Sequence, residues 1–219
     1  MAHGQVSAIL AGIMQLSKIG KNINRYEAGW HVVVALLVAI GLELVLSNTL
    51  TFGAKYAVAG LEVVLILLLV VFPLRAGLKR VFAILLLGLI SFVNLVSLGL
   101  VIAALLGGLH IDGHQLLISS LAIYLTNIIV FGLWYWELDN TRQAIPDFLF
   151  PQQATTQGEI SWKPNFFDYL YISLTNATAF SPTDAMPLTH RAKLLMAIQA
   201  VVSLVTVALV VARAVNILS

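Results

Sequence analysis

The chain has 219 residues, of which 60% are hydrophobic and only 10% are charged. Soluble domains carry about 25% charged residues, so this composition indicates an integral membrane protein whose surroundings are the lipid bilayer. The formal net charge of +2 is too small to indicate a nucleic-acid partner. Because the sequence contains no cysteine, disulfide bonds, thiolate metal sites and cysteine nucleophiles are excluded.

The N-terminal region, residues 1–29, combines apolar positions spaced for one helix face with the basic residues Lys18, Lys21 and Arg25. No basic start precedes its apolar run, so a cleavable signal peptide is not predicted. We expect instead a segment that lies at the membrane interface.

Four apolar segments follow, each about 18 residues or longer, which is the length that a helix needs to cross a bilayer. They cover residues 30–50, 57–74, 81–106 and 115–136, and residues 192–218 make a fifth. The sequence therefore predicts an all-α, polytopic membrane fold with five transmembrane helices. We divide it into the N-terminal segment, a three-helix membrane region over 30–114 and a final module over 115–219.

Two glutamates, Glu43 and Glu62, lie inside the first and second predicted spans. A carboxylate within the bilayer is costly, which makes it a functional candidate. Arg213, in the fifth span, falls on the same side of the membrane as both glutamates if all five segments cross. We expect a structural ion pair between Arg213 and one of them, with gating, proton coupling or ion binding as the alternative roles.

His110, Asp112 and His114 have a spacing that could hold a metal, but the surrounding glycines are typical of an ordinary exposed loop. We therefore expect no metal site there and no cofactor. No serine has a histidine and a carboxylate at a recognisable motif spacing, and the sequence has no phosphate-binding or dinucleotide fingerprint. An enzyme is not expected.

A short helix is predicted between the fourth and fifth spans. Residues 165–177 form an amphipathic segment too short to cross a bilayer, and residues 178–189 form a polar turn with two prolines. Asn165 followed by Asp168 is an N-cap pattern for this helix, and Asp168 and Tyr171 are expected to fix it to its neighbours. A half-crossing helix and an irregular turn predict a re-entrant loop, which lipid tolerates only beside protein or a water-filled cavity.

The same stretch matches the spacing of a motif found in ion channels, without gaps. The matching positions are residues 168–173 (DYLYIS), Asp184, Pro187, Thr189 and residues 209–213 (LVVAR). On these residues it resembles the pore loop and inner helix of the potassium-channel superfamily. The resemblance implies a homotetrameric channel for inorganic cations. The whole chain also resembles a family of small bacterial integral membrane proteins of uncharacterised function, which implies a bacterial plasma membrane.

The resemblance breaks at the selectivity filter, where the motif T-T-V-G-Y-G is replaced by Thr178, Ala179, Phe180, Ser181, Pro182 and Thr183. A potassium filter stacks backbone carbonyls toward the axis. Glycine permits that backbone, whereas the proline ring fixes φ and prevents it. We therefore expect side-chain oxygens, with a ring of Asp184 carboxylates, to line a constriction that selects weakly for cations.

Two other functions remain open from the sequence. One is a non-conducting membrane scaffold or accessory protein that retains the pore fold, and the other is a small transporter that couples protons through Glu43 or Glu62.

The sequence gives two conflicting indications of the orientation of the protein in the membrane. Ten of the 12 basic residues lie on the side of the N-terminus if all five segments span, which places that side and the pore-like loop in the cytoplasm. Potassium channels insert this loop from outside, so the resemblance favours the opposite orientation for the loop.

Overall fold

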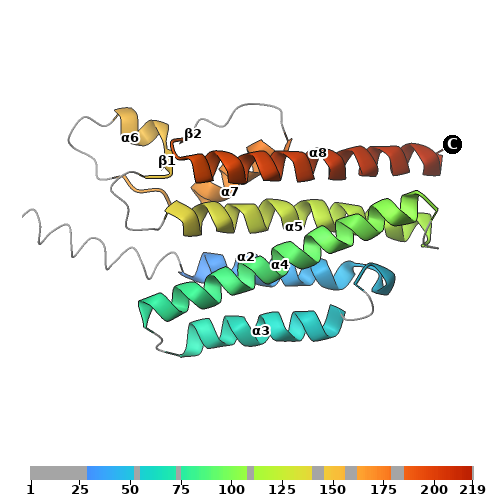
Figure 1. Ribbon diagram of the computed structural model, residues 1–219, viewed down its shortest axis with the longest axis horizontal. Helices are drawn as coiled ribbons and strands as arrows, with labels where there is room; N and C mark the ends of the chain where they lie inside the picture. Colours follow the sequence, from blue (N-terminus) through green and yellow to red (C-terminus); the bar gives the residue numbers. More distant parts are fainter. Residues whose placement is uncertain are drawn as a thin grey trace, which may run out of the picture.

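The computed structural model describes residues 29–51, 55–72, 75–107, 111–139, 146–155, 162–178 and 185–218. Its helices lie side by side along one direction, with α3 at one edge of the bundle and α8 at the other (Figure 1). The described chain is mostly helical, with the elements α2 (Gly29–Val45), η1 (Asn48–Thr51), α3 (Lys55–Val71), α4 (Ala76–Leu105), α5 (Gly113–Asp139), β1 (Phe148–Leu149), α6 (Pro151–Thr155), α7 (Phe166–Thr178), β2 (Met186–Pro187) and α8 (His190–Leu218).

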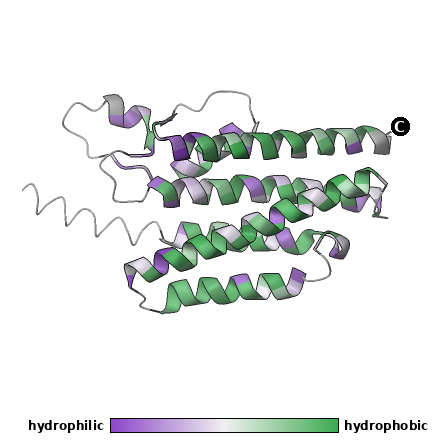
Figure 2. Cartoon of the chain, viewed as in Figure 1, coloured by the Kyte–Doolittle hydropathy of each residue, from purple (hydrophilic) through white to green (hydrophobic). Residues whose placement is uncertain are grey.

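Three of the described helices, α4, α5 and α8, are long and apolar enough to cross a membrane. The predicted helical membrane protein is confirmed to this extent. The other two predicted spans correspond to α2 and α3, which have 17 residues each. Hydrophobic residues run along α3, α4 and α8, with single hydrophilic bands within the helices as well as at their ends (Figure 2).

The central helix of the bundle is α5. It packs against α2 and α4 on one side and against α7 and α8 on the other. Among the three long helices, α5 is the most buried and α8 the least. An apolar helix that is buried all round belongs to a core, whereas the free face of α8 must be covered by lipid or by protein.

The connection between α5 and α7 packs onto one end of the bundle. Its strand β1 pairs with β2 in antiparallel register, Phe148 opposite Pro187 and Leu149 opposite Met186. The buried rings of Phe148 and Phe150 contact those of Tyr135 and Tyr169. These ring contacts hold the described part of the connection against the bundle. Residues 1–28 of the predicted interfacial segment lie outside the described residues.

Candidate functional site

The short helix α7 begins with the predicted cap. The backbone N–H of Phe167 donates to Oδ1 of Asn165 over 2.8 Å, and the N–H of Asn165 donates to Oδ2 of Asp168 over 2.6 Å. These reciprocal bonds satisfy two backbone donors at a helix start, and the carboxylate also favours the positive end of the helix dipole. The N-cap prediction is confirmed, and Asp168 acts through the backbone of its own helix.

From this cap, α7 runs back along α5. Near its start, the hydroxyl of Tyr169 donates to Oδ2 of Asp139, the last residue of α5, over 2.5 Å. One turn later, Oγ of Ser173 donates to the carbonyl oxygen of Ile128, three turns back in α5, over 2.6 Å. Between these bonds, a Cβ at Gly132 would lie 3.1 Å from Cα of Leu170, so the two backbones approach closely. The helix therefore points from the end of the bundle toward its middle.

The far end of α7 is held by α8. Nδ2 of Asn176 donates to the carbonyl oxygen of Met196 and to Oε1 of Gln199, each over 2.9 Å. Nε2 of Gln199 donates in turn to Oγ of Ser173 over 2.7 Å, and the Tyr135 hydroxyl also donates to Oε1 of Gln199. Gln199 lies only a few turns into α8, so α7 stops partway along that helix.

The chain then returns to the end where it started. Strand β2, which follows α7, pairs with β1 beside the first residues of α8 (Figure 1). The backbone N–H of Leu188 donates to the carbonyl oxygen of Asp147 over 2.8 Å. Asp147 also accepts from Nε of Arg191 over 2.7 Å and from the hydroxyl of Thr189. This ion pair between Asp147 and Arg191, called the clamp below, holds the α5–α7 connection against the start of α8.

The residues expected in the ion pathway fall at the turn between α7 and β2. Thr178 is the last residue of α7, and its hydroxyl donates to the carbonyl oxygen of Thr175 over 3.2 Å. The other six expected residues lie outside the described part of the chain: Ala179, Phe180, Ser181, Pro182, Thr183 and Asp184.

The side chains that hold α7 differ in part from those expected. Tyr171 is more than half exposed. The holding contacts come from Tyr169, Ser173 and Asn176, and burial together with the neighbouring Asp139 carboxylate raises the pKa of the Tyr169 phenol. That phenol therefore remains a hydrogen-bond donor at neutral pH. Gln199 was the available signal in the sequence, because it is a polar residue in the middle of an apolar segment.

Asn127 of α5 makes a hydrogen bond to another helix. Its Nδ2 donates to Oγ of Ser203 in α8 over 2.8 Å. Asp112, considered above as a metal ligand, instead accepts from the backbone N–H groups of His114 and Gln115 over 3.0 and 3.2 Å and so caps α5. His110 lies outside the described residues.

A second polar site lies among α2, α3, α4 and α5. Glu43 of α2 is 4% exposed and Glu62 of α3 is 0% exposed, and their carboxyl groups interact with each other. Apart from this contact between the two carboxyl groups, no hydrogen-bond donor within the described chain reaches Oε1 of Glu43 or either carboxyl oxygen of Glu62. The two glutamates thus lie in the same half of the bundle, which agrees with their expected place on one side of the membrane.

The expected ion-pair partner lies elsewhere. Nε of Arg213 donates to the carbonyl oxygen of Gly113, at the start of α5, over 3.5 Å. The ion pairs found within the described ranges are Arg80 with Glu137, at 3.2 Å, and Arg191 with Asp147. The structure therefore brings the two glutamates together but not Arg213.

Comparison with known proteins gave no relative: no protein-family model, no curated protein and no solved structure matches this chain. Function is therefore inferred from the geometry of the two polar sites and from the resemblance in the α7–α8 stretch.

Proposed function

We propose that the protein is a homotetrameric, potassium-channel-like cation channel of a bacterial plasma membrane, with a non-standard filter and weak cation selectivity. In this proposal α2 and α3 cross the bilayer together with α4, α5 and α8. The module formed by α5, α7 and α8 supplies the pore, with α5 as the outer helix, α7 as the re-entrant half-helix and α8 as the inner helix.

The observation that carries the proposal is the course of α7. This helix of 13 residues starts at the end of α5, stops beside Gln199 of α8, and is followed by a strand back at the starting end. Backbone that turns inside a bilayer must border protein or a water-filled cavity. A single turn per chain cannot enclose a path, so copies of the chain around an axis complete it.

The proposed path is lined by side-chain oxygens at the C-terminal end of α7. Thr178, Ser181 and Thr183 supply hydroxyl groups, and Asp184 supplies a ring of carboxylates. The C-terminal end of a helix carries partial negative charge, which also favours a cation there. A path of this kind attracts cations without replacing their whole hydration shell, so discrimination among them is weak.

The exposed face of α8 supports a second function. The polar residues Gln199, Ser203 and Thr206 are all buried toward the chain's own helices. Beyond the first turn of α8, which exposes His190 and Lys193, the exposed large side chains are apolar: Leu194, Ile198, Val201, Leu204, Val207, Val211 and Val215. If this face surrounds the axis, the path below the filter is hydrophobic and closes by dewetting. A permanently dewetted axis would make the protein a non-conducting scaffold that retains the pore fold.

Cation flux from the purified protein in liposomes separates these functions. We expect K⁺ and Na⁺ flux from the wild type, a tetrameric mass in detergent, and a loss of selectivity for cations over anions in Asp184→Asn. Asp112→Asn is the matched control, because Asp112 caps α5 and lies outside the proposed path. A folded tetramer without flux would establish the scaffold, and a monomer would overturn both.

A further inference from the structure

Among the described residues, no basic side chain forms an ion pair with the carboxyl groups of Glu43 and Glu62. From α4 and α5, the residues that line the cavity beside Glu43 are all uncharged: Ile90, Val93, Asn94, Ser97 and Thr126. The nearest basic side chain on the hairpin is Lys55, whose Nζ donates to the carbonyl oxygens of Leu44 and Leu46 over 3.3 and 3.1 Å. Lys55 therefore caps the end of α2 rather than pairing with a carboxylate.

Such a pair cannot hold two bare negative charges. Removing a carboxylate from water costs several kcal/mol, and a second carboxylate beside it adds repulsion. The charge must be balanced by protons or by a bound cation. The pair therefore takes up positive charge from outside the chain.

An independent observation points to a ligand. Thr126 of α5 is 3% exposed, and its hydroxyl has no hydrogen-bond partner within the described chain. Other buried hydroxyls of the bundle have partners: Ser120 and Thr206 donate to the carbonyl four residues back, of Leu116 and Val202, and Ser97 donates to the carbonyl oxygen of Leu50. Thr126 does not, and it lines the same cavity as Glu43. A buried residue with an unpartnered hydroxyl therefore borders the cavity beside Glu43.

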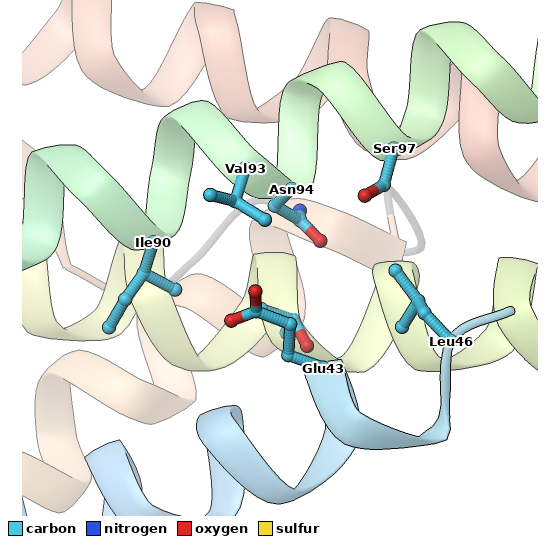
Figure 3. Close-up of a pocket in the computed structure, with 7 residues that line it drawn as sticks. Glu43, Leu46, Ile90, Val93, Asn94 and Ser97 are labelled. Carbon is cyan, nitrogen blue, oxygen red and sulfur yellow. The ribbon is translucent and has the colours of Figure 1, made fainter. Parts of the chain in front are cut away.

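The cavity is small and polar on the side of α4. Figure 3 shows Glu43 reaching up from α2 toward α4, where Asn94 and Ser97 lie above it. The space open to the centre of a water-sized particle is about 10 Å³, close to the minimum for one water molecule. One small ion fits such a space, whereas an organic substrate does not.

We propose that this cavity binds one small inorganic cation through oxygens of Glu43 and Thr126, with the neighbouring carboxyl group of Glu62 sharing the compensating negative charge, and that protons replace the cation when it leaves. Carboxylate, hydroxyl and amide oxygens are the ligands that hard cations prefer. With both carboxyls protonated, a monovalent cation displaces one proton and a divalent cation displaces two. The net charge within the bundle is then the same in every state.

The site is separate from the proposed pore. It is built from α2, α3, α4 and α5, whereas the pore module uses α5, α7 and α8. Cation binding here does not require conduction by the protein, and conduction does not require this site. The Asp184 experiment and the one below therefore succeed or fail independently.

The test uses the full chain in detergent with little buffer. NaCl or CaCl₂ is added while released protons and the melting temperature are followed, with choline chloride as the control for ionic strength. We expect a saturable release, with Ca²⁺ releasing twice as many protons per bound ion as Na⁺ if both bind. We also expect a higher melting temperature with the bound cation, and tighter binding at higher pH because fewer protons compete.

Three variants assign the effect to this cavity. Glu62→Gln and Glu43→Gln keep the shape of the side chain and should abolish the saturable proton release. Thr126→Val should weaken cation binding by at least about tenfold, whereas Thr206→Val, whose hydroxyl bonds within its own helix, should leave it unchanged. The proposal is overturned if folded wild type shows neither proton release nor a melting shift with either cation, or if both persist in the two glutamine variants.

Discussion

The bundle contains two regions of buried polar side chains that differ in whether their polar atoms have hydrogen-bond partners. In the module of α5, α7 and α8, Gln199 is 0% exposed, and both ends of its amide have partners. Beside the cavity lined by α2, α4 and α5, Glu62 of α3 is equally buried, yet apart from its contact with Glu43 neither of its carboxyl oxygens meets a donor within the described chain. Buried polar groups are normally satisfied. The satisfied region is therefore a structural joint, and the unsatisfied one is a place for a ligand.

The largest effect on stability is expected from removing the hydrogen bonds that join α5, α7 and α8. Gln199→Leu removes the group that links Tyr135, Ser173 and Asn176, and it leaves part of their hydrogen-bonding capacity unmet inside the bundle. Each such group costs about 1–3 kcal/mol, although hydrogen bonds between membrane helices average only about 0.6 kcal/mol. We expect a loss of about 3 kcal/mol in the free energy of unfolding, measured by titration with sodium dodecyl sulfate.

Thr206→Val is the matched control for that variant. Thr206 lies two turns further along α8, and its hydroxyl donates only to the carbonyl oxygen of Val202 in the same helix. A change of less than about 0.5 kcal/mol is expected, because no other helix loses a partner. If both variants cost the same, the links between α5, α7 and α8 do not hold the module together.

The clamp at the end of the bundle should contribute somewhat less. Asp147→Ala removes a carboxylate that is 1% exposed and paired with Arg191, whose side chain is 37% exposed. The guanidinium then turns to water, so the loss should be about 2 kcal/mol rather than the 3–5 kcal/mol of a fully buried pair. Because the chain has no cysteine, disulfide cross-linking between Leu149→Cys and Met186→Cys reports whether β1 still pairs with β2. Undiminished cross-linking with unchanged stability would contradict the clamp.

A smaller effect is expected where α5 and α7 approach closely. A Cβ at Gly132 would lie 3.1 Å from the backbone of Leu170, so Gly132→Ala should lower stability by about 1 kcal/mol through overpacking. Gly88 in α4 has nothing within 4 Å of that position, and Gly88→Ala should raise stability by about 0.5–1 kcal/mol through helix propensity. Opposite signs in the same unfolding titration would confirm the close packing of α7, and equal signs would refute it.

The smallest effect on stability is expected from changing the carboxyl pair of Glu43 and Glu62. In cation-free buffer, Glu62→Gln removes a buried acid and supplies a donor for Glu43, so stability should stay the same or rise by about 1 kcal/mol. Unfolding in detergent mixtures with and without CaCl₂ measures this difference. A loss comparable to that of Gln199→Leu would mean that the carboxyl pair is already satisfied in the free protein.

The sequence alone determined the features that depend on neighbouring residues. Apolar segments of spanning length gave helices close to the expected bounds, and the Asn165–Asp168 pattern gave the cap of α7. The hairpin of α2 and α3 was enough to bring Glu43 and Glu62 into one half of the bundle. These features follow from helical geometry and chain connection, which act over a few residues or across one turn.

Only the tertiary structure decided which side chains meet across helices. Arg213 lies at the expected end of the bundle but turns to Gly113, and Gln199 rather than Tyr171 holds α7 in place. The rotation of each helix about its axis selects these partners, and it is set by the packing of whole helix faces. No pattern along a single helix contains that information, so composition could propose the buried acids but not that they would be left to face each other.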